Sequence, residues 1–353
     1  MPLRVRELID AGHHCVRRSH ASIAAMLVIS ALHLPYQAKA QSPIAKSPVA
    51  PSATRGRVYV PNRVYDSRKK QWIDFETLAE RANTSEIVFV GEQHNDSDGH
   101  ALELALLEGI ARRRVGGGPV VLSLEMFERD VQSELDAYLA GLKDEQAFLA
   151  RSRPWPNYHD DYRPLVELAR TLNWPVIAAN IPRPLAAVVS HGGLKSLDTL
   201  NAIIRSQQIA ADLSCPRDQY FKLFSEVMSG GHGGPSASAP TNTDSVKAAA
   251  AAAEAMTFRF YEAQCVKDET MSESVARAFH SAQSKGKNAL VVHMNGAFHT
   301  DYSLGTAERA LKRAKGAKHM VISIVPTPDL DTVDAKSMRK RADYLVFTIA
   351  KSE

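Results

Sequence analysis

The sequence predicts an α/β protein with a mostly parallel β-sheet flanked by helices and a smaller all-helical lid inserted before the last strands. Apolar, β-branched runs end abruptly at a glycine or a polar residue, as at residues 87–91 and 289–296, which is typical of buried parallel strands. These runs alternate with helical patterns, as in βαβ units. Between residues 184 and 284 the pattern is helical without a convincing strand, which indicates a separate helical insertion.

Strands and helices alternate on both sides of the insertion. Strands are predicted at residues 86–90, 120–124, 175–179, 288–294, 319–325 and 344–349, with helices at 98–114, 161–172 and 307–315. A Gly-Gly-Gly-Pro break at 116–119 separates the first helix from the second strand. We therefore assign residues 58–185 to the first part of the α/β core and residues 285–353 to its second part.

The insertion, residues 186–284, is predicted to form the lid. Helical patterns cover residues 196–208, 217–228 and 245–282, and a Gly/Ser/Ala/Pro-rich loop covers residues 229–243. The lid should lie beside the sheet edge at which the glycine-ended strands stop.

The N-terminus has the pattern of a secretory signal peptide, residues 1–40. Four arginines precede the apolar stretch 21–34, and Ala38 and Ala40 provide a small-x-small cleavage site. A membrane anchor is the alternative, but fourteen residues fall short of the roughly 18 needed to span a bilayer. Residues 41–57, rich in Pro, Ser and Ala, are expected to form a disordered linker. The protein is therefore expected to be periplasmic or secreted after cleavage near Ala40.

Removing the signal changes how charge and cysteine content are interpreted. Residues 1–40 hold five Lys/Arg and two Asp/Glu, so the mature chain carries 38 basic and 37 acidic residues, a net charge of +1. This balance gives no indication of nucleic-acid binding. Cys215 and Cys265 remain as an even pair in an exported protein, which predicts a disulfide between them; two buried thiols are the alternative.

Polar side chains follow the predicted strands at the edge where open α/β sheets bind ligands. Glu92 and His94 are two apart after the first strand, Glu125 follows the second, and a Gly-x-x-His turn ends in His299. A carboxylate and an imidazole at one edge can bind a metal or act as a base and its orienting group. Each residue also has a structural explanation, as a helix cap, a helix start or a hydrogen-bonded core group. His293, on a strand, is more typical of a core residue.

Several segments resemble the ChaN-like family of haem-binding uptake proteins. They are the Gly-Glu-Gln-His-Asn-Asp motif at 91–96, Leu-Glu-Met-Phe-Glu-Arg-Asp at 124–130, the aromatic and proline-rich residues 154–165, Ala-Asn-Ile-Pro-Arg at 179–183, residues 263–271, and Asn-Gly-x-x-His at 295–299. The family is similar to the Tiki proteases and the erythromycin esterases, which share a glutamate-histidine motif and a later Gly-x-x-His. The resemblance covers roughly residues 60 to 305.

This resemblance implies an exported, iron-regulated protein that binds haem, as a cofacial pair between two protomers, in a homodimer that serves an outer-membrane haem receptor system. Tyrosine ligation of the haem iron is implied, but no motif identifies the residue. The candidate haem contacts are Tyr158, His159, Tyr220, Met228 and His232, and Arg183 is the candidate for holding an anionic group.

Three functions remain open from the sequence. The first is haem binding for haem and iron uptake. The second is a metal-dependent hydrolase in which Glu92, His94, Glu125 and His299 hold a divalent ion or activate water, as the Tiki and esterase branches imply. The third is a non-catalytic binding module on the same fold. Gly-x-Ser-x-Gly, a Gly-x-Gly-x-x-Gly run after the first strand and His-Glu-x-x-His are all absent, which argues against three common enzyme classes.

Overall fold

The computed structural model describes residues 59–114, 117–231, 243–284 and 288–351. These belong to one compact unit, Val58–Glu353. The expected signal peptide 1–40, the linker 41–57, most of the loop 229–243 and His232 lie outside the described residues. Within the described ranges, none of the helices combines the length and apolar character needed to cross a bilayer.

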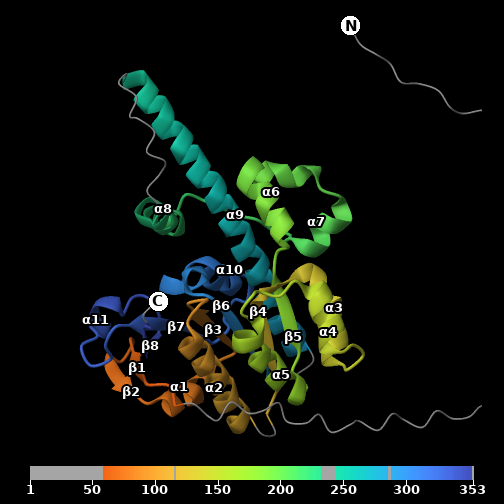
Figure 1. The fold of residues 1–353 in the computed structure, drawn as a ribbon, viewed down its shortest axis with the longest axis vertical. Coiled ribbons are helices and arrows are strands. Elements are labelled where there is room, and N and C mark those ends of the chain that lie inside the picture. Colours follow the sequence, from red (N-terminus) through yellow and green to blue (C-terminus); the bar gives the residue numbers. More distant parts are fainter. Residues whose placement is uncertain (1–58, 115–116, 232–242, 285–287, 352–353) are drawn as a thin grey trace, which may run out of the picture. The chain divides into compact units, whose positions relative to one another are not determined.

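An eight-stranded mixed sheet forms the centre of the fold, as Figure 1 shows, in the order β2-β1-β8-β7-β3-β6-β4-β5. The strands are β1 (Asn62–Asp66), β2 (Gln71–Ile73), β3 (Ile87–Glu92), β4 (Val120–Glu128), β5 (Val176–Asn180), β6 (Leu290–Gly296), β7 (His319–Thr327) and β8 (Tyr344–Ile349). All neighbours from β8 to β5 pair in parallel, and only the hairpin β1–β2 and the β1–β8 pair are antiparallel. The predicted fold class is confirmed.

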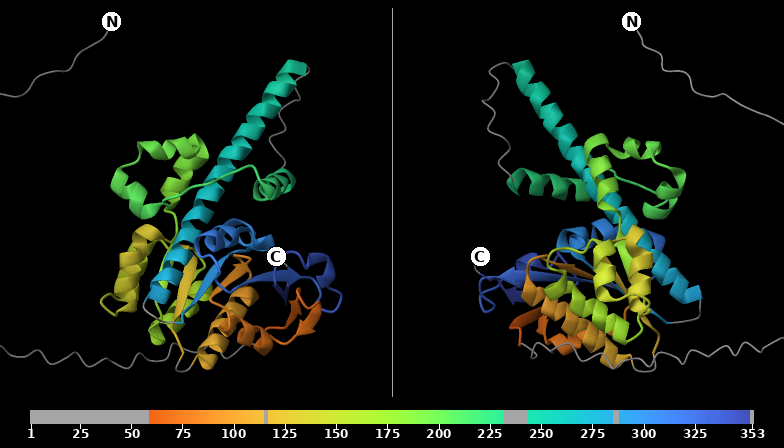
Figure 2. Two further views of the ribbon diagram at one scale, coloured as in Figure 1. Left: turned by 180° about the vertical axis from the view of Figure 1, so that it is seen from behind. Right: turned by 45° about the vertical axis from the view of Figure 1, so that its right-hand side comes forward.

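Helices cover both faces of the sheet (Figures 1 and 2). They are α1 (Phe75–Asn83), α2 (Ser97–Arg113), α3 (Gln132–Leu139), α4 (Glu145–Ser152), α5 (Arg163–Thr171), α6 (Arg183–Gly192), α7 (Ala202–Gln208), α8 (Gln219–Gly231), α9 (Thr243–Ser284), α10 (Gly305–Arg313) and α11 (Ala335–Met338). Side chains from α1, α2 and α5 share one apolar core with one face of the sheet, and side chains from α9 and α10 share a second core with the other face. Burial of β3 on both faces explains why its sequence is continuously apolar.

Alternation along the strands decides which core each side chain joins. On β3, Val88 and Val90 belong to the core below α2, whereas Phe89 belongs to the core below α9. Glu92 therefore continues the α2 side. On β4, Val121 lies on the α9 side, and Glu125 follows it by four residues on that same side.

The lid consists of α6, α7, α8 and the first part of α9. Ala263 and Val266 of α9 pack with Val189 of α6, and Tyr261 of α9 packs with Tyr220 of α8. The last part of α9 packs on the sheet through Val275 and its neighbours, so one helix joins lid and core. Figure 2 shows this helix running from the sheet into the lid.

One prediction about the lid is wrong in detail, and one helix of the lid is not indicated by the sequence. Residues 196–208 were expected to form one helix, but a 3-10 turn, Leu194–Thr199, is followed by a break and then α7. The break occurs because Asn201 caps α7: its side chain accepts a hydrogen bond from Ile203 N (2.8 Å). Helix α6 was not predicted, and it starts with Arg183-Pro184, where proline fits the first turn of a helix.

Candidate functional site

Glu92, the last residue of β3, lies at the carboxyl end of the sheet on the side that α2 covers. Its side chain is buried, and its Oε1 accepts hydrogen bonds from His94 Nδ1 (2.8 Å) and from the Tyr162 hydroxyl. Glu92 and His94 therefore do lie on one side, as their spacing predicted. Burial and the charge of Glu103 raise the pKa of Glu92 to about 7, although the hydrogen bond from His94 opposes this shift.

His94 presents its imidazole at the edge of the sheet. The side chain is 45% exposed, and its ring packs edge-on against Trp155, with 4.6 Å between ring centroids. Its backbone carbonyl accepts hydrogen bonds from Asn157 Nδ2 (2.8 Å) and His100 Nε2 (3.1 Å). A Cβ at Gly296 would lie 2.8 Å from His94 Nε2, so the glycine at the end of β6 provides the space for this ring.

Glu125 reaches the same region from the opposite face of the sheet. Its Oε2 accepts a hydrogen bond from the backbone N–H of Gly296 (2.7 Å), and its Oε1 lies 3.2 Å from His299 Nε2. A Cβ at Gly296 would be 3.7 Å from Glu125 Oε2. Glu125 and His94 thus meet around Gly296, although they belong to separate hydrogen-bonded groups.

His299 is bound by carboxylates on both ring nitrogens. Its Nδ1 donates to Asp268 Oδ1 of α9 (2.7 Å), and Asp268 also accepts hydrogen bonds from Tyr220 (2.8 Å) and Thr306 (2.8 Å). Burial would lower the pKa of His299, but Glu125 and Asp268 raise it to about 10. Burial would likewise raise the pKa of Glu125, but the charge and hydrogen bond of His299 hold it well below its usual range. Both ring nitrogens of His299 thus face carboxylates, and in this arrangement neither is free to act as a base.

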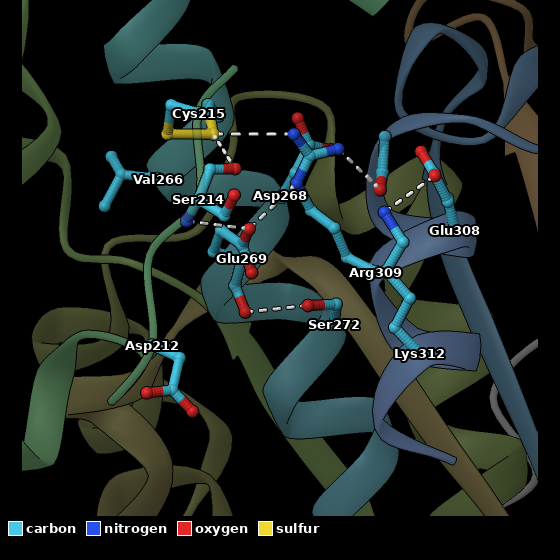
Figure 3. Close-up of polar contacts among 12 residues, drawn as sticks. Asp212, Ser214, Cys215, Val266, Asp268, Glu269, Ser272, Glu308, Arg309 and Lys312 are labelled. Atoms are coloured by element: carbon cyan, nitrogen blue, oxygen red, sulfur yellow. Dashed lines mark hydrogen bonds and ion pairs between the residues drawn. A yellow bond between two sulfur atoms is a disulfide. The ribbon is translucent and has the colours of Figure 1, made fainter. Parts of the chain in front are cut away.

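A disulfide and a group of charged side chains lie around Glu269, the residue that follows Asp268 on α9 (Figure 3). Glu269 accepts a hydrogen bond from Arg309 Nε of α10 (3.1 Å) and pairs with Arg313 (2.6 Å). The predicted disulfide between Cys215 and Cys265 is present, and Arg309 Nη2 lies 3.5 Å from Cys265 Sγ. Because α9, α10 and the segment before α8 are joined at this point, the part of α9 that carries Asp268 is held by three parts of the chain.

The decisive comparison is with a family model described as haem-binding uptake, Tiki superfamily, ChaN, which matches residues 78–310. The chain belongs to this family. The solved structure of ChaN of Campylobacter jejuni, described as binding haem cofacially, is 14% identical, covers 82% of this chain and 97% of that chain, and superposes with a TM-score of 0.54. At this identity the likeness shows the fold alone.

Two further solved structures are more distant. An erythromycin esterase mutant in its open conformation is 12% identical, covers 83% of this chain and 85% of that chain, and gives a TM-score of 0.40. A protein from Bacillus cereus is 14% identical, covers 72% of this chain and 69% of that chain, and also gives 0.40. A comparison with curated proteins finds no match.

In this ChaN-family chain the residues expected to contact haem are dispersed. Tyr158 is buried among Phe127 and Phe148, and the Tyr220 hydroxyl donates to Asp268 (2.8 Å). His159 is exposed on the π-helical turn Tyr158–Tyr162, and Met228 is half-buried on α8.

Arg183 follows β5 in the chain, as the sequence predicted, and it is the first residue of α6. Its Nε donates to Glu128 Oε1 (2.7 Å) and its Nη2 donates to the carbonyl of Arg153 (2.9 Å). The side chain is nevertheless 58% exposed. Its guanidinium can thus contact an anion at the surface while it stays paired with Glu128.

The sequence did not indicate several residues that the structure places at or near the candidate site. Tyr162 and Asp268 were within the motifs, but only the folded chain shows that they hold Glu92 and His299. His100 and Glu103 are three apart on a predicted helix, a spacing that could have suggested a pair. No sequence pattern indicated Tyr302. In the structure its φ is 61° and its side chain is 44% exposed. It lines a pocket of about 260 Å³ together with Lys222, Glu226 and other residues of α8.

Proposed function

We propose that this protein binds haem and serves haem or iron uptake. The observation that carries the proposal is the match of the ChaN haem-binding family over residues 78–310. The fold resemblance to ChaN of Campylobacter jejuni, which is described as binding haem, supports it.

Exposed apolar side chains on the lid support this proposal. Met256 and Phe260, one turn apart on α9, are 47% and 37% exposed, and Ile203 and Ile204 on α7 are 63% and 44% exposed. Haem needs apolar walls, and a second protomer needs an apolar surface. We therefore propose that haem binds at the lid, with a homodimer as its assembly.

Tyr302 is our preferred axial ligand, beside the candidates that the sequence suggested. Its side chain is accessible at the pocket with α8, whereas Tyr158 and Tyr220 are fully buried. Lys222, 78% exposed on α8, can contact a propionate there. Arg183, His159, Met228 and His232 remain candidates for further contacts.

Haemin titration of the mature protein tests whether it binds haem and whether Tyr302 is the axial ligand. The wild type should show a shifted Soret band that saturates at stoichiometric haemin, and Tyr302→Phe should weaken binding at least about 10-fold, since one axial bond is lost. Tyr220→Phe is the matched control and should leave the spectrum unchanged. A flat wild-type titration would refute haem binding. An unchanged Tyr302→Phe would refute only this ligand, and Met228→Leu and His159→Ala would then be tested.

Export and assembly are part of the same proposal. We propose that the chain is cleaved after Ala40, acts in the periplasm or outside the cell, and delivers haem to or from an outer-membrane receptor system. The disulfide supports an oxidising compartment. Mass spectrometry of the cell-fractionated protein should give an N-terminus at Gln41.

Sedimentation velocity tests the proposed homodimer. It should show a dimer upon haemin addition, and a persistent monomer would contradict this assembly.

A hydrolase is the second candidate, and the Glu92–His94 pair favours it. Glu92 fixes Nδ1 of His94, and among the described residues we find no hydrogen bond to its Nε2, which is the arrangement of a general base. Water activated there would have Glu125 nearby. A divalent ion held by Glu92, His94, Glu125 and His299 would require one ring nitrogen of His299 to give up its present carboxylate partner.

Screening ester substrates with the wild type, with His94→Ala and with metal-free protein tests this candidate. Activity that survives His94→Ala would contradict it. If neither haem nor hydrolysis is found, the non-catalytic binding module is the remaining candidate.

A further inference from the structure

A second buried cluster lies behind the Glu92–His94 pair, on the α2 side of the sheet. Helix α2 places His100 and Glu103 one turn apart, and both side chains are buried. His100 Nδ1 lies 2.9 Å from Glu103 Oε2 and 3.6 Å from Glu92 Oε2. One ligand atom from each of these three residues falls within 4.8 Å of the others.

No arginine or lysine pairs with this cluster in the described part of the chain, whereas several other buried carboxylates pair with arginine. Asp66 pairs with Arg81, Glu128 with Arg153 and Arg183, Glu269 with Arg309 and Arg313, and Asp301 with Arg341. Within the described residues, Glu92 and Glu103 form ion pairs with histidines only. Two buried carboxylates without a lysine or arginine leave an excess of negative charge, which is costly inside a protein.

Two oxygen atoms of this cluster also lack hydrogen bonds. Glu92 Oε2 and Glu103 Oε1 are both buried, and neither has a hydrogen-bond partner in the described part of the chain. An unsatisfied buried acceptor costs about 1–3 kcal/mol. The unsatisfied Glu92 Oε2 faces His100, because Glu92 Oε1 is already used by His94 and Tyr162.

We propose that Glu92, His100 and Glu103 bind a divalent first-row transition-metal ion, with Zn²⁺ or Mn²⁺ as the candidates. Two carboxylates and one imidazole suit these ions better than Mg²⁺ or Ca²⁺, which prefer oxygen ligands alone. A dipositive ion would neutralise both carboxylates and use both unsatisfied oxygens.

The surroundings of His100 also fit this role. His100 Nε2 donates to the backbone carbonyl of His94 (3.1 Å), which leaves Nδ1 to point at the two carboxylates. Metal-binding histidines commonly donate their other ring N–H in this way. Glu92 Oε1 accepts the hydrogen bond that orients the His94 ring. An ion bound to Glu92 Oε2 would hold this carboxylate in place, and would thereby also hold the exposed imidazole of His94.

This site is distinct from the Glu125–His299–Asp268 group, which lies on the α9 side of the sheet. It does not depend on haem binding, because Tyr302 and the lid residues are not part of it. The proposal thus survives a negative haem titration, and haem binding survives a negative metal analysis.

Metal analysis of the full mature protein tests the proposal. After chelator treatment and dialysis, the wild type should take up about one equivalent of Zn²⁺ or Mn²⁺ by mass spectrometry and calorimetry, and its Tm should rise with the ion. Glu103→Gln and His100→Gln should each weaken binding on the order of 100-fold while their circular dichroism stays that of the wild type.

A matched control separates this site from other histidines. His293 is buried on the opposite face, and its Nε2 has no hydrogen-bond partner among the described residues, so His293→Gln should keep the ion. Co²⁺ loaded in place of the ion should give a visible absorption band that disappears in His100→Gln, which reports the ligand directly. No uptake by the wild type would overturn the proposal, and so would binding that survives Glu103→Gln but is lost in His299→Ala.

Discussion

Removing the Cys215–Cys265 disulfide should lower the free energy of unfolding by about 4 kcal/mol. The two cysteines are 50 residues apart, so the bond closes a long loop in the unfolded chain. The chain-entropy relation for a loop of this length gives about 14 cal/mol/K, which is about 4 kcal/mol at 25 °C. Since a domain is typically stable by only about 5–15 kcal/mol, this is a large fraction of the total.

The closed loop also contains residues of the candidate site. It spans α8 with Tyr220, whose hydroxyl donates to Asp268, and Cys265 Sγ lies against Arg309 Nη2 (3.5 Å). Loss of the disulfide therefore frees the segment that holds Asp268 against His299. We expect Cys215→Ala/Cys265→Ala to lose part of this order in addition to the loop entropy.

Urea unfolding followed by circular dichroism measures the effect. The oxidised wild type is compared with the double variant, each with and without dithiothreitol. Reductant should destabilise the wild type and leave the double variant unchanged, which controls for effects of the reagent. A difference below about 1 kcal/mol between wild type and double variant would refute the loop-entropy reasoning.

Three further changes test the packing of the site. Glu125→Gln should destabilise by about 3 kcal/mol in urea unfolding, because it removes one partner of the buried His299 imidazolium, and a neutral effect would contradict the pairing. Gly305→Ala should cost about 3 kcal/mol or more, since its φ is +54° and a Cβ would lie 2.4 Å from the His299 carbonyl oxygen. Gly316→Ala is the control: its φ is +83° and no atom of the described residues lies within 4 Å of a Cβ there, so it should cost only about 1 kcal/mol. Burial lowers the pKa of His293 from 6.5 to about 4, so its neutral form is stabilised by folding: this contribution is complete above pH 6.5 and is lost as the pH falls toward 4. Between pH 7 and 4.5 the wild type should lose about 2 kcal/mol more than His293→Gln, and equal losses would contradict the shift.

Most of the sheet could be predicted from sequence because its strands are buried and apolar. The six predicted strands match β3 to β8 within a few residues, since parallel strands covered on both faces have a continuous hydrophobic pattern. The hairpin β1–β2 was not predicted. It consists of Asn62–Asp66 and Gln71–Ile73, which are short, partly polar and at the sheet edge, so neither carries a clear period-two signal.

The apolar runs of the sequence place Glu92, His94, Glu125 and His299 at or near the ends of predicted strands, and the cysteine count leaves Cys215 and Cys265 to pair. Strand β4 in fact continues past Glu125 to Glu128. How these residues are grouped follows from the folded chain. Strand β6 lies between β3 and β4 although it comes about two hundred residues after β3, and side-chain alternation sends Glu92 and Glu125 to opposite faces. Asp268, which belongs to a helix shared by lid and core, accepts the hydrogen bond of His299 Nδ1. Strand order and face depend on contacts distant in sequence, which local patterns do not encode.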